Sequence, residues 1–540
     1  MIAPSKVLNY KSLLYLNSLF VSIVVLMPLA IIFLSFFGET SSYFKLLKET
    51  FFLDYIMNTT ILLVGVCLVS LLLGIISAYL VSFYTFPAVG FFKYGLILSF
   101  AIPPYIYAYS LSSFFENYGT AYSILNFFFR NNITNSLIPD VNGFIGFIIS
   151  LSLTLFGYVF ILARSSFIFQ SQNLIEVGKN LGLSTKQIFF KIIIPSARPA
   201  LIAGTALVSM ETISDFGTVS FFGVSTFTTA IYNSWISFDD LNTANRLSFF
   251  LIFFILFFFC IEKVSRKNAK YYNTSGQSSD KRLRIYKLKG NKGVFAFIFC
   301  VVLFFISFIF PVIQMLYWTF KFPNFISEIN ILELNINVLF IVLASSSIII
   351  LIGFLTNYTN RIFKNTLLNF LSIFLISGYA IPGVILSISL ITFFSIVFKY
   401  TNISILYLGS IYALILAYFI RFFSIAFNGI KSSYSKINKS IDESAYLIGI
   451  SKFKTFILIH LPTLKQPVTL IGVLIGIEIL KELPITLILR PFNFETFSTL
   501  AFSYAEQDLI EAAAFPSIFL IFWTTIFILI SSKIFLSEKK

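Results

Sequence analysis

The sequence predicts an all-α polytopic membrane protein with about twelve transmembrane helices, arranged as two parallel six-helix repeats. Three observations lead to this prediction. The chain of 540 residues is 58% hydrophobic and only 11% charged, whereas a soluble domain carries about 25% charged residues. It contains about twelve apolar runs long enough to cross a bilayer. One polar segment between these runs occurs twice, once in each half of the chain.

The apolar runs are expected to be helices because backbone groups in lipid must be satisfied within their own segment. A bilayer core of about 30 Å requires about 20 residues per helix. The first run is too long for the apolar region of a signal peptide and is expected to be retained. The runs are 13–37, 59–83, 94–115, 143–166, 198–222 and 246–262 in the first half, and 293–318, 336–357, 367–395, 403–427, 465–489 and 513–534 in the second.

The distribution of Lys and Arg predicts the orientation of these helices. Basic residues gather in the loops that a cytoplasmic N-terminus would place inside, and the outer loops hold few. We attribute the net charge of +15 to this asymmetry, so no nucleic-acid partner is predicted. Twelve crossings return both termini to the cytoplasm.

A polar, basic linker at residues 263–292 divides the chain into two halves, 1–262 and 293–540. Each half holds six predicted helices, an even number, so both begin on the same side of the membrane. This predicts parallel repeats related by an axis along the membrane normal. The linker is also a candidate for binding lipid headgroups.

The duplicated polar segment reads EVGKNLGLSTKQIFFKIIIP in the first half and ESAYLIGISKFKTFILIHLP in the second. Its Glu, Gly and Pro recur with a displacement of 267 residues, the difference between positions 176 and 443. We expect a short helix that ends at Gly182 in a left-handed cap, then a second helix that Pro195 breaks. The predicted loops span 172–198 and 439–465. The alternative is an ordinary amphipathic loop on the lipid headgroups.

This segment resembles the EAA loop of ABC-type importer permeases, which docks into a groove of the ATP-hydrolysing subunit, and the chain is similar to type I importer permeases. The leading triplets EVG and ESA keep only the Glu in full. The resemblance implies further apolar groove contacts at Phe190 and Phe453. It implies ATPase-coupling roles for Glu176, Gly182, Phe189, Pro195, Glu443, Gly449, Phe456 and Pro462.

Two pairs of carboxylates follow the duplicated segment at the same displacement: Glu211 with Asp215, and Glu478 with Glu482. The i, i+4 spacing predicts that each pair shares one helix face. Carboxylates within a membrane are costly unless they face water or a partner, so we expect all four to line a translocation pathway. The alternative is structural: Lys481 neutralises a glutamate, and Asp215 caps a helix.

Three segments narrow the family: METISDFGTVSFFGVSTFTTAIYNSW, KELPITLILRPFNFETFSTLAF and IPPYIYAYS resemble fused ferric-iron permeases. That resemblance implies a bacterial inner-membrane location and Fe(III) delivered by a periplasmic binding protein, which would dock on loops 116–142 and 224–245. Thiamine, polyamine and sulfate permeases share the EAA loop and stay open as alternatives. A secondary transporter would not explain the two Glu–Gly–Pro segments.

No catalytic or metal site is predicted. Three scattered cysteines and the single histidine, His460, form no ligand spacing; His460 is expected to be a polar interface residue. The sequence has no G-x-x-x-x-G-K-[ST] loop, so ATP and Mg are expected on two copies of a separate ATPase. Pro103, Pro104 and Pro382 interrupt predicted helices, either as gating bends or as static kinks.

Overall fold

The computed structural model of the chain describes residues 4–129, 138–168, 172–267, 286–327, 329–363, 370–372, 375, 377–401 and 409–537. The elements before the linker are α1 (Pro4–Phe36), α2 (Ser42–Thr50), α3 (Phe52–Phe83), β1 (Tyr84–Thr85), α4 (Val89–Gly95), η1 (Leu96–Ala101), α5 (Pro104–Phe115), α6 (Thr120–Phe129), α7 (Gly143–Ile168), α8 (Gln172–Asn180), α9 (Thr185–Ile188), η3 (Phe189–Ile193), α10 (Ile194–Ser214), α11 (Gly217–Phe221), α12 (Phe227–Ile236) and α13 (Leu241–Lys267).

The elements that follow are β2 (Tyr286–Lys287), α14 (Asn291–Phe304), η4 (Phe305–Ile309), α15 (Phe310–Lys321), α16 (Asn324–Ser327), α17 (Ile331–Ile362), η5 (Ser377–Ala380), α19 (Gly383–Thr401), α20 (Ile411–Ser435), α21 (Lys439–Leu447), α22 (Lys452–Thr455), η6 (Phe456–His460), α23 (Leu461–Lys481), α24 (Pro484–Leu489), α25 (Phe497–Glu506) and α26 (Ile510–Ser537). Within the described ranges the chain is almost entirely helical, as predicted.

Each predicted apolar run corresponds to helix in the structure, but not all are single long spans. Ten helices of the described chain are long and apolar enough to cross a membrane. An eleventh candidate span is a pair, Val89–Ala101 and Pro104–Phe129, bent by 89°. The run predicted at 246–262 corresponds to a shorter apolar helix, Leu241–Phe257. The count of twelve is therefore approximate.

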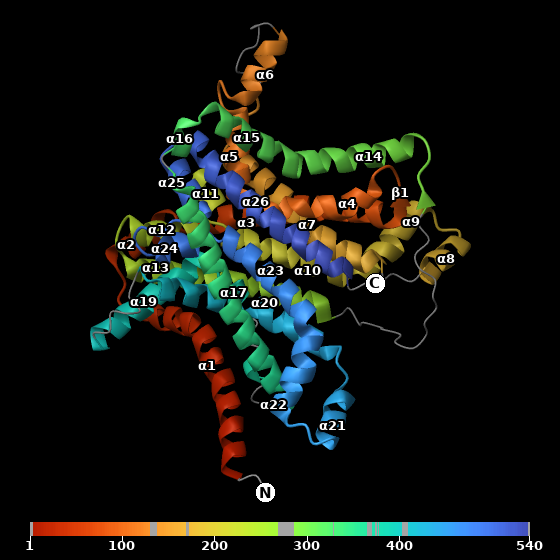
Figure 1. Cartoon of the computed structure of the whole chain (residues 1–540). Coiled ribbons are helices and arrows are strands. Elements are labelled where there is room, and N and C mark those ends of the chain that lie inside the picture. Colours follow the sequence, from red (N-terminus) through yellow and green to blue (C-terminus); the bar gives the residue numbers. More distant parts are fainter. Residues whose placement is uncertain are drawn as a thin grey trace.

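The two sequence halves are interlocked through their first helices. Helix α1 packs on α17 and α19 of the second half as well as on its own α13, while α15 packs on α5 of the first half and on its own α26. The buried clusters follow this exchange: Val25 belongs to a core rich in second-half residues, and Cys300 to the core of the first half. Figure 1 shows α1 and α14 on opposite edges of the bundle. The halves are sequence repeats, but neither forms a separate packing unit.

Glycines bring the central helices of each half into close contact. A Cβ on Gly74 of α3 would lie 2.6 Å from Val159 Cβ on α7, and a Cβ on Gly204 of α10 would lie 2.9 Å from Val159 Cα. In the second half, Gly429 of α20 and Gly472 of α23 meet isoleucines in the same way. Small residues allow this approach in membranes, where packing drives helix association.

The connection between the halves returns along the first half. Residues 268–285 of the predicted linker lie outside the described residues. Beyond them β2 pairs in parallel with β1, Tyr84 with Tyr286 and Thr85 with Lys287. The end of the linker is thus fixed directly after α3, before α14 begins.

Candidate functional site

Both copies of the duplicated segment form helical hairpins at the periphery of the bundle, α8 with α9 and α21 with α22 (Figure 1). The glycine between the two helices has positive φ in each copy, +78° at Gly182 and +85° at Gly449. The amide after each glycine donates back into the helix, from Leu183 to the Gly178 carbonyl and from Ile450 to the Ala445 carbonyl, at 3.0 Å in each case. This is the pattern of a helix ended by a left-handed glycine, which confirms the predicted turn.

Two further features of the hairpins were not recognised in the sequence. Ser184 caps α9 through a reciprocal capping box with Gln187, and the amide of Lys454 donates to Ser451 Oγ, 267 residues after Ser184. The third position of each triplet, Gly178 or Ala445, is buried. A Cβ on Gly178 would lie 2.6 Å from Ile192 Cδ1, so the hairpin closes only on a small residue.

The predicted break at Pro195 is wrong, and so is the one at Pro462. Residues Thr185–Ser214 and Phe453–Lys481 each run as one apolar helix. A π turn precedes each proline, η3 or η6, and the amides of Ile194 and Leu461 donate five residues back, to Phe189 and Phe456. Proline lies in the first turn after the π turn, where its missing N–H costs little. The hairpin therefore continues directly into the transmembrane helix.

The aromatic residues of the hairpins face in two directions. Phe189 packs on Tyr79 of α3 with ring centroids 4.6 Å apart, and Phe456 packs on Tyr358 of α17 at 4.5 Å. These two rings attach the hairpins to the bundle, whereas the resemblance implied groove contacts for them. Phe190 and Phe453, the other implied groove contacts, are 60% and 55% exposed.

The hairpin tips carry exposed apolar side chains that the sequence analysis missed. Leu181 is 74% exposed and Ile448 is 78% exposed, each directly before the turn glycine. Glu176 is partly buried and Glu443 is exposed. An apolar residue beside a glycine turn on a polar loop is the signal that would have identified the tips.

The carboxylate pairs do not share one helix face, because each helix ends between its two carboxylates. Helix α10 ends at Ser214 and α23 at Lys481. Asp215 then caps α11: its Oδ1 accepts from the amides of Thr218 and Val219 at 3.0 and 3.1 Å. The structural alternative for Asp215 is thereby confirmed, and the i, i+4 prediction is wrong.

All four carboxylates nevertheless meet at one cavity between the halves. It encloses about 650 Å³, open solvent included. The lining includes Pro103 and Pro104 with Tyr105 at the start of α5, Tyr158 of α7, and the basic side chains Arg421 and Lys481. Both basic residues come from the second half. Four carboxylates against two cations leave the lining acidic: Glu211, Asp215, Glu478 and Glu482.

Three of these carboxylates have partners. Glu211 accepts a hydrogen bond from the Tyr379 hydroxyl of η5, which joins the halves. Glu482 Oε2 lies 3.3 Å from Arg421 Nε, with both side chains 7% exposed. Lys481 Nζ lies 3.7 Å from Glu478 Oε1. The predicted Lys481 pair is present, while Arg421 was not recognised as part of the site.

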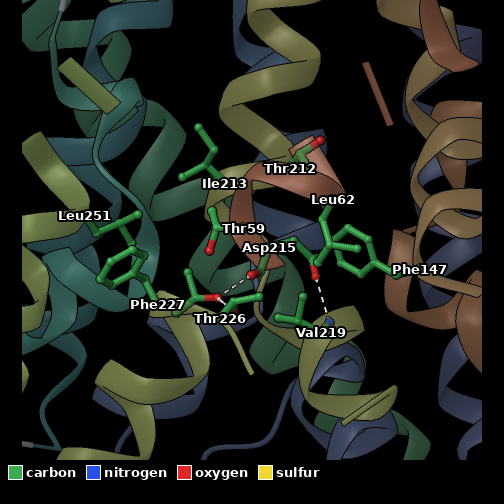
Figure 2. A pocket seen from close by; sticks show the side chains of 11 residues that line it. Thr59, Leu62, Phe147, Thr212, Ile213, Asp215, Val219, Thr226, Phe227 and Leu251 are labelled. Carbon is green, nitrogen blue, oxygen red and sulfur yellow. Dashed lines mark hydrogen bonds between the residues drawn. The ribbon is translucent and has the colours of Figure 1, made fainter. Parts of the chain in front are cut away.

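Asp215 also lines a second, smaller cavity of about 240 Å³. Its other polar lining consists of threonine hydroxyls, among them Thr226 and Thr228 (Figure 2). Thr228 Oγ1 donates to the Asp215 carbonyl at 2.9 Å. In the second half Ser498 Oγ donates to the Glu482 carbonyl at 3.3 Å. The same hydroxyl contact thus supports the helix end in both halves.

The predicted proline bends are present as geometry. Pro103 and Pro104 lie at the 89° bend between η1 and α5. Pro382 lies between η5 and α19, and Gly383 after it meets the cavity: a Cβ there would lie 2.4 Å from Glu482 Oε1. Whether these bends move in a transport cycle stays a prediction. Among the described residues no three His, Cys, Asp or Glu side chains converge as metal ligands.

Comparisons with known proteins place this architecture among transport components. Residues 70–266 match the family described as binding-protein-dependent transport system inner membrane component. The chain is 25% identical over 473 residues to the Fe(3+)-transport system permease protein FbpB 2 of Haemophilus influenzae, covering 86% of each chain. It is 25% identical over 148 residues to the sulfate transport system permease protein CysT of Salmonella typhimurium, 27% of this chain and 50% of that protein. It is 20% identical over 195 residues to the molybdate/tungstate transport system permease protein WtpB of Thermococcus kodakarensis, 36% of this chain and 70% of that one.

Proposed function

Residues 70–266 belong to the binding-protein-dependent transport system inner membrane components, and from this premise we propose that the whole chain is the permease subunit of an ATP-driven Fe(III) importer. Two copies of a separate ATPase would dock on the two hairpins. A solute-binding protein would deliver the cargo to the opposite face. The second half supports this reading because it repeats the hairpin, the π turn and the carboxylate cavity of the first.

The observation that carries the proposal is the continuous helix between each hairpin and the cavity. Thr185–Ser214 is 30 residues long, about 45 Å at 1.5 Å per residue. It begins at the hairpin turn and ends beside Glu211 and Asp215. Movement of the hairpin by an ATPase would therefore reach the cavity through a single rigid element, without an intervening loop.

The charge of the cavity favours a cationic cargo. Its four carboxylates exceed its two basic side chains, and a cleft lined by one sign of charge attracts the opposite sign. Carboxylate oxygens suit hard cations. The sulfate and molybdate/tungstate relatives are named for oxyanions, which this lining would repel. Similarity over 86% of the chain to an Fe(3+) permease agrees with the same cargo class.

The orientation follows from the hairpins if they face a cytoplasmic ATPase. The N-terminus, the C-terminus and both hairpins then lie inside, in a bacterial inner membrane. The exposed tips Leu181 and Ile448 would enter the apolar grooves of the two ATPase copies. The solute-binding protein would contact the other face, where α6 and α12 lie in loops 116–142 and 224–245; residues 130–137 are outside the described residues.

Purification with the ATPase and the solute-binding protein, followed by reconstitution in liposomes, tests this function. Iron-loaded binding protein should raise ATP hydrolysis and drive Fe(III) into the lumen. Stimulation by thiamine-, polyamine- or sulfate-loaded protein instead would refute the cargo and keep the permease. Uptake driven by an ion gradient without any ATPase would refute the ATP-driven mechanism.

A further inference from the structure

One carboxylate joins the second hairpin to three other parts of the bundle. Asp442, in the first turn of α21, accepts a hydrogen bond from Arg361 Nε at the end of α17 at 2.8 Å. Its other oxygen lies 2.8 Å from His460 Nε2 in η6. The remaining Arg361 nitrogens donate to the carbonyls of Tyr434 and Ile437, beside the end of α20, at 3.1 and 3.2 Å. We call Arg361, Asp442 and His460 the hairpin clamp.

The hairpin clamp is buried and well satisfied. The side chains of Arg361, Asp442 and His460 are 8%, 13% and 1% exposed. Burial alone would raise the pKa of Asp442, but hydrogen bonds from Arg361 and His460 outweigh it and hold that pKa below its usual value. Charge-assisted hydrogen bonds of this kind are stronger than neutral ones. His460 also packs edge-on against Tyr434 and Tyr358.

The first hairpin has no such cluster at the matching positions. A displacement of 267 residues aligns Asp442 with Ile175 and His460 with Ile193, which are 5% and 3% exposed within one apolar cluster. Arg361 corresponds to Ser82, since Gly353 of α17 aligns with Gly74 of α3. The Ser82 hydroxyl is buried and has no hydrogen-bond partner among the described residues.

The first hairpin instead contacts the end of the linker. Lys179 Nζ lies 4.1 Å from the centre of the Tyr286 ring in β2. Lys179 is exposed, and a cation–π contact at an exposed site is weak. The two hairpins thus share one shape but are attached by different interactions: a buried charged cluster in the second, apolar packing with an exposed contact in the first.

We propose that Arg361, Asp442 and His460 are positioning residues that fix the second hairpin rigidly to α17, α20 and α23, so that the two hairpins transmit ATPase motion unequally. The inference rests on the proposed function, because it assumes that the hairpins receive that motion. The second hairpin acts as the stiff lever. The first, which lacks the clamp, yields under the same displacement.

The test uses the full chain with its ATPase and solute-binding protein in liposomes. Asp442→Asn removes the charge at nearly constant shape. The triple variant R361S/D442I/H460I installs the residues of the first half and guards against misfolding of the single variant. Asp240→Asn is the matched control, because Asp240 caps α13 through several hydrogen bonds, far from both hairpins.

Asp442→Asn and the triple variant should lower the solute moved per ATP about tenfold, within the range common for coupling between sites. Amide hydrogen exchange of the permease alone should rise in 440–450 and stay unchanged in 175–183. Asp240→Asn should change neither. Unchanged exchange, or raised exchange with a normal transport ratio, would overturn the clamp. If the wild-type chain shows no stimulated hydrolysis, the proposed function fails instead.

Discussion

The ion pair between Arg421 and Glu482 makes the sharpest prediction about the cavity. At 3.3 Å between Nε and Oε2, two unit charges attract by about 5 kcal/mol at an effective dielectric constant of about 20. Arg421 Nη1 also donates to the Ile381 carbonyl at 3.2 Å. The Nε itself makes no hydrogen bond, so the contact with Glu482 is an ion pair without hydrogen-bond geometry. Desolvation opposes this attraction, but removing one partner leaves the other charge buried.

We expect Arg421→Met to lower the free energy of unfolding by about 3–5 kcal/mol, the usual cost of breaking a buried pair. The double variant R421M/E482Q should recover at least half of that loss, because no charge is left unpaired. Unfolding by SDS in mixed micelles measures both. Arg490→Met is the control: Arg490 pairs with Glu495, but the two side chains are 23% and 36% exposed, so it should cost less than about 1 kcal/mol.

Additive losses in the double variant, or a loss below about 1 kcal/mol for Arg421→Met, would refute this reasoning, since residues in contact should couple. Such a result would mean that water already screens the pair. The four carboxylates would then face an aqueous passage with no internal cation.

Three further outcomes follow from the hairpins and the helix caps. Gly449→Ala should destabilise the hairpin by about 1–2 kcal/mol, because its φ is +85° and a Cβ is strained there; Gly90→Ala, which has open space, should change melting temperature little. Leu181→Asp and Ile448→Asp should each reduce co-purification of the ATPase without altering the melting temperature of the permease. Burial would raise the pKa of Asp240, but hydrogen bonds from Ser41 and Thr243 and from backbone amides lower it. Its stabilisation is therefore present above the ordinary Asp pKa of about 3.9 and is lost as pH falls through the lowered value; a melting temperature of Asp240→Asn that shifts equally at pH 3 and pH 7 would contradict this.

Periodic and repeated features of the chain were predictable from the sequence. Long apolar runs admit only helices in lipid, so the membrane fold is confirmed, and the family match confirms the permease resemblance. The left-handed turn at Gly182 was predictable because glycine adopts positive φ without strain. The four carboxylates were predicted to share one pathway, and the structure brings them to one cavity; their role in transport stays a prediction.

The errors share a physical origin in backbone geometry that residue spacing does not encode. Pro195 was expected to end a helix because it lacks an N–H, but one inserted residue in a π turn moves the hydrogen bonds and lets the helix continue. Asp215 and Glu482 were placed on helices by their spacing, although each helix ends just before them. Arg421 was missed because it lies 61 residues before Glu482, the difference between their positions, and only tertiary packing brings them together.

The same geometry explains why the π turns occur at equivalent positions in both halves. A proline one residue into an ordinary helix would clash with the carbonyl four residues earlier. The π turn directs the amides of Ile194 and Leu461 to Phe189 and Phe456, the two rings that pack on Tyr79 and Tyr358. One local device therefore both removes the proline penalty and attaches the hairpin to the bundle. Pro462→Ala should allow the π turn to revert to α-helix, which rotates Phe456 away from Tyr358 by about 100° per residue of helix. A cysteine pair at positions 358 and 456 that crosslinks equally well with and without Pro462→Ala would show that the proline does not set this attachment.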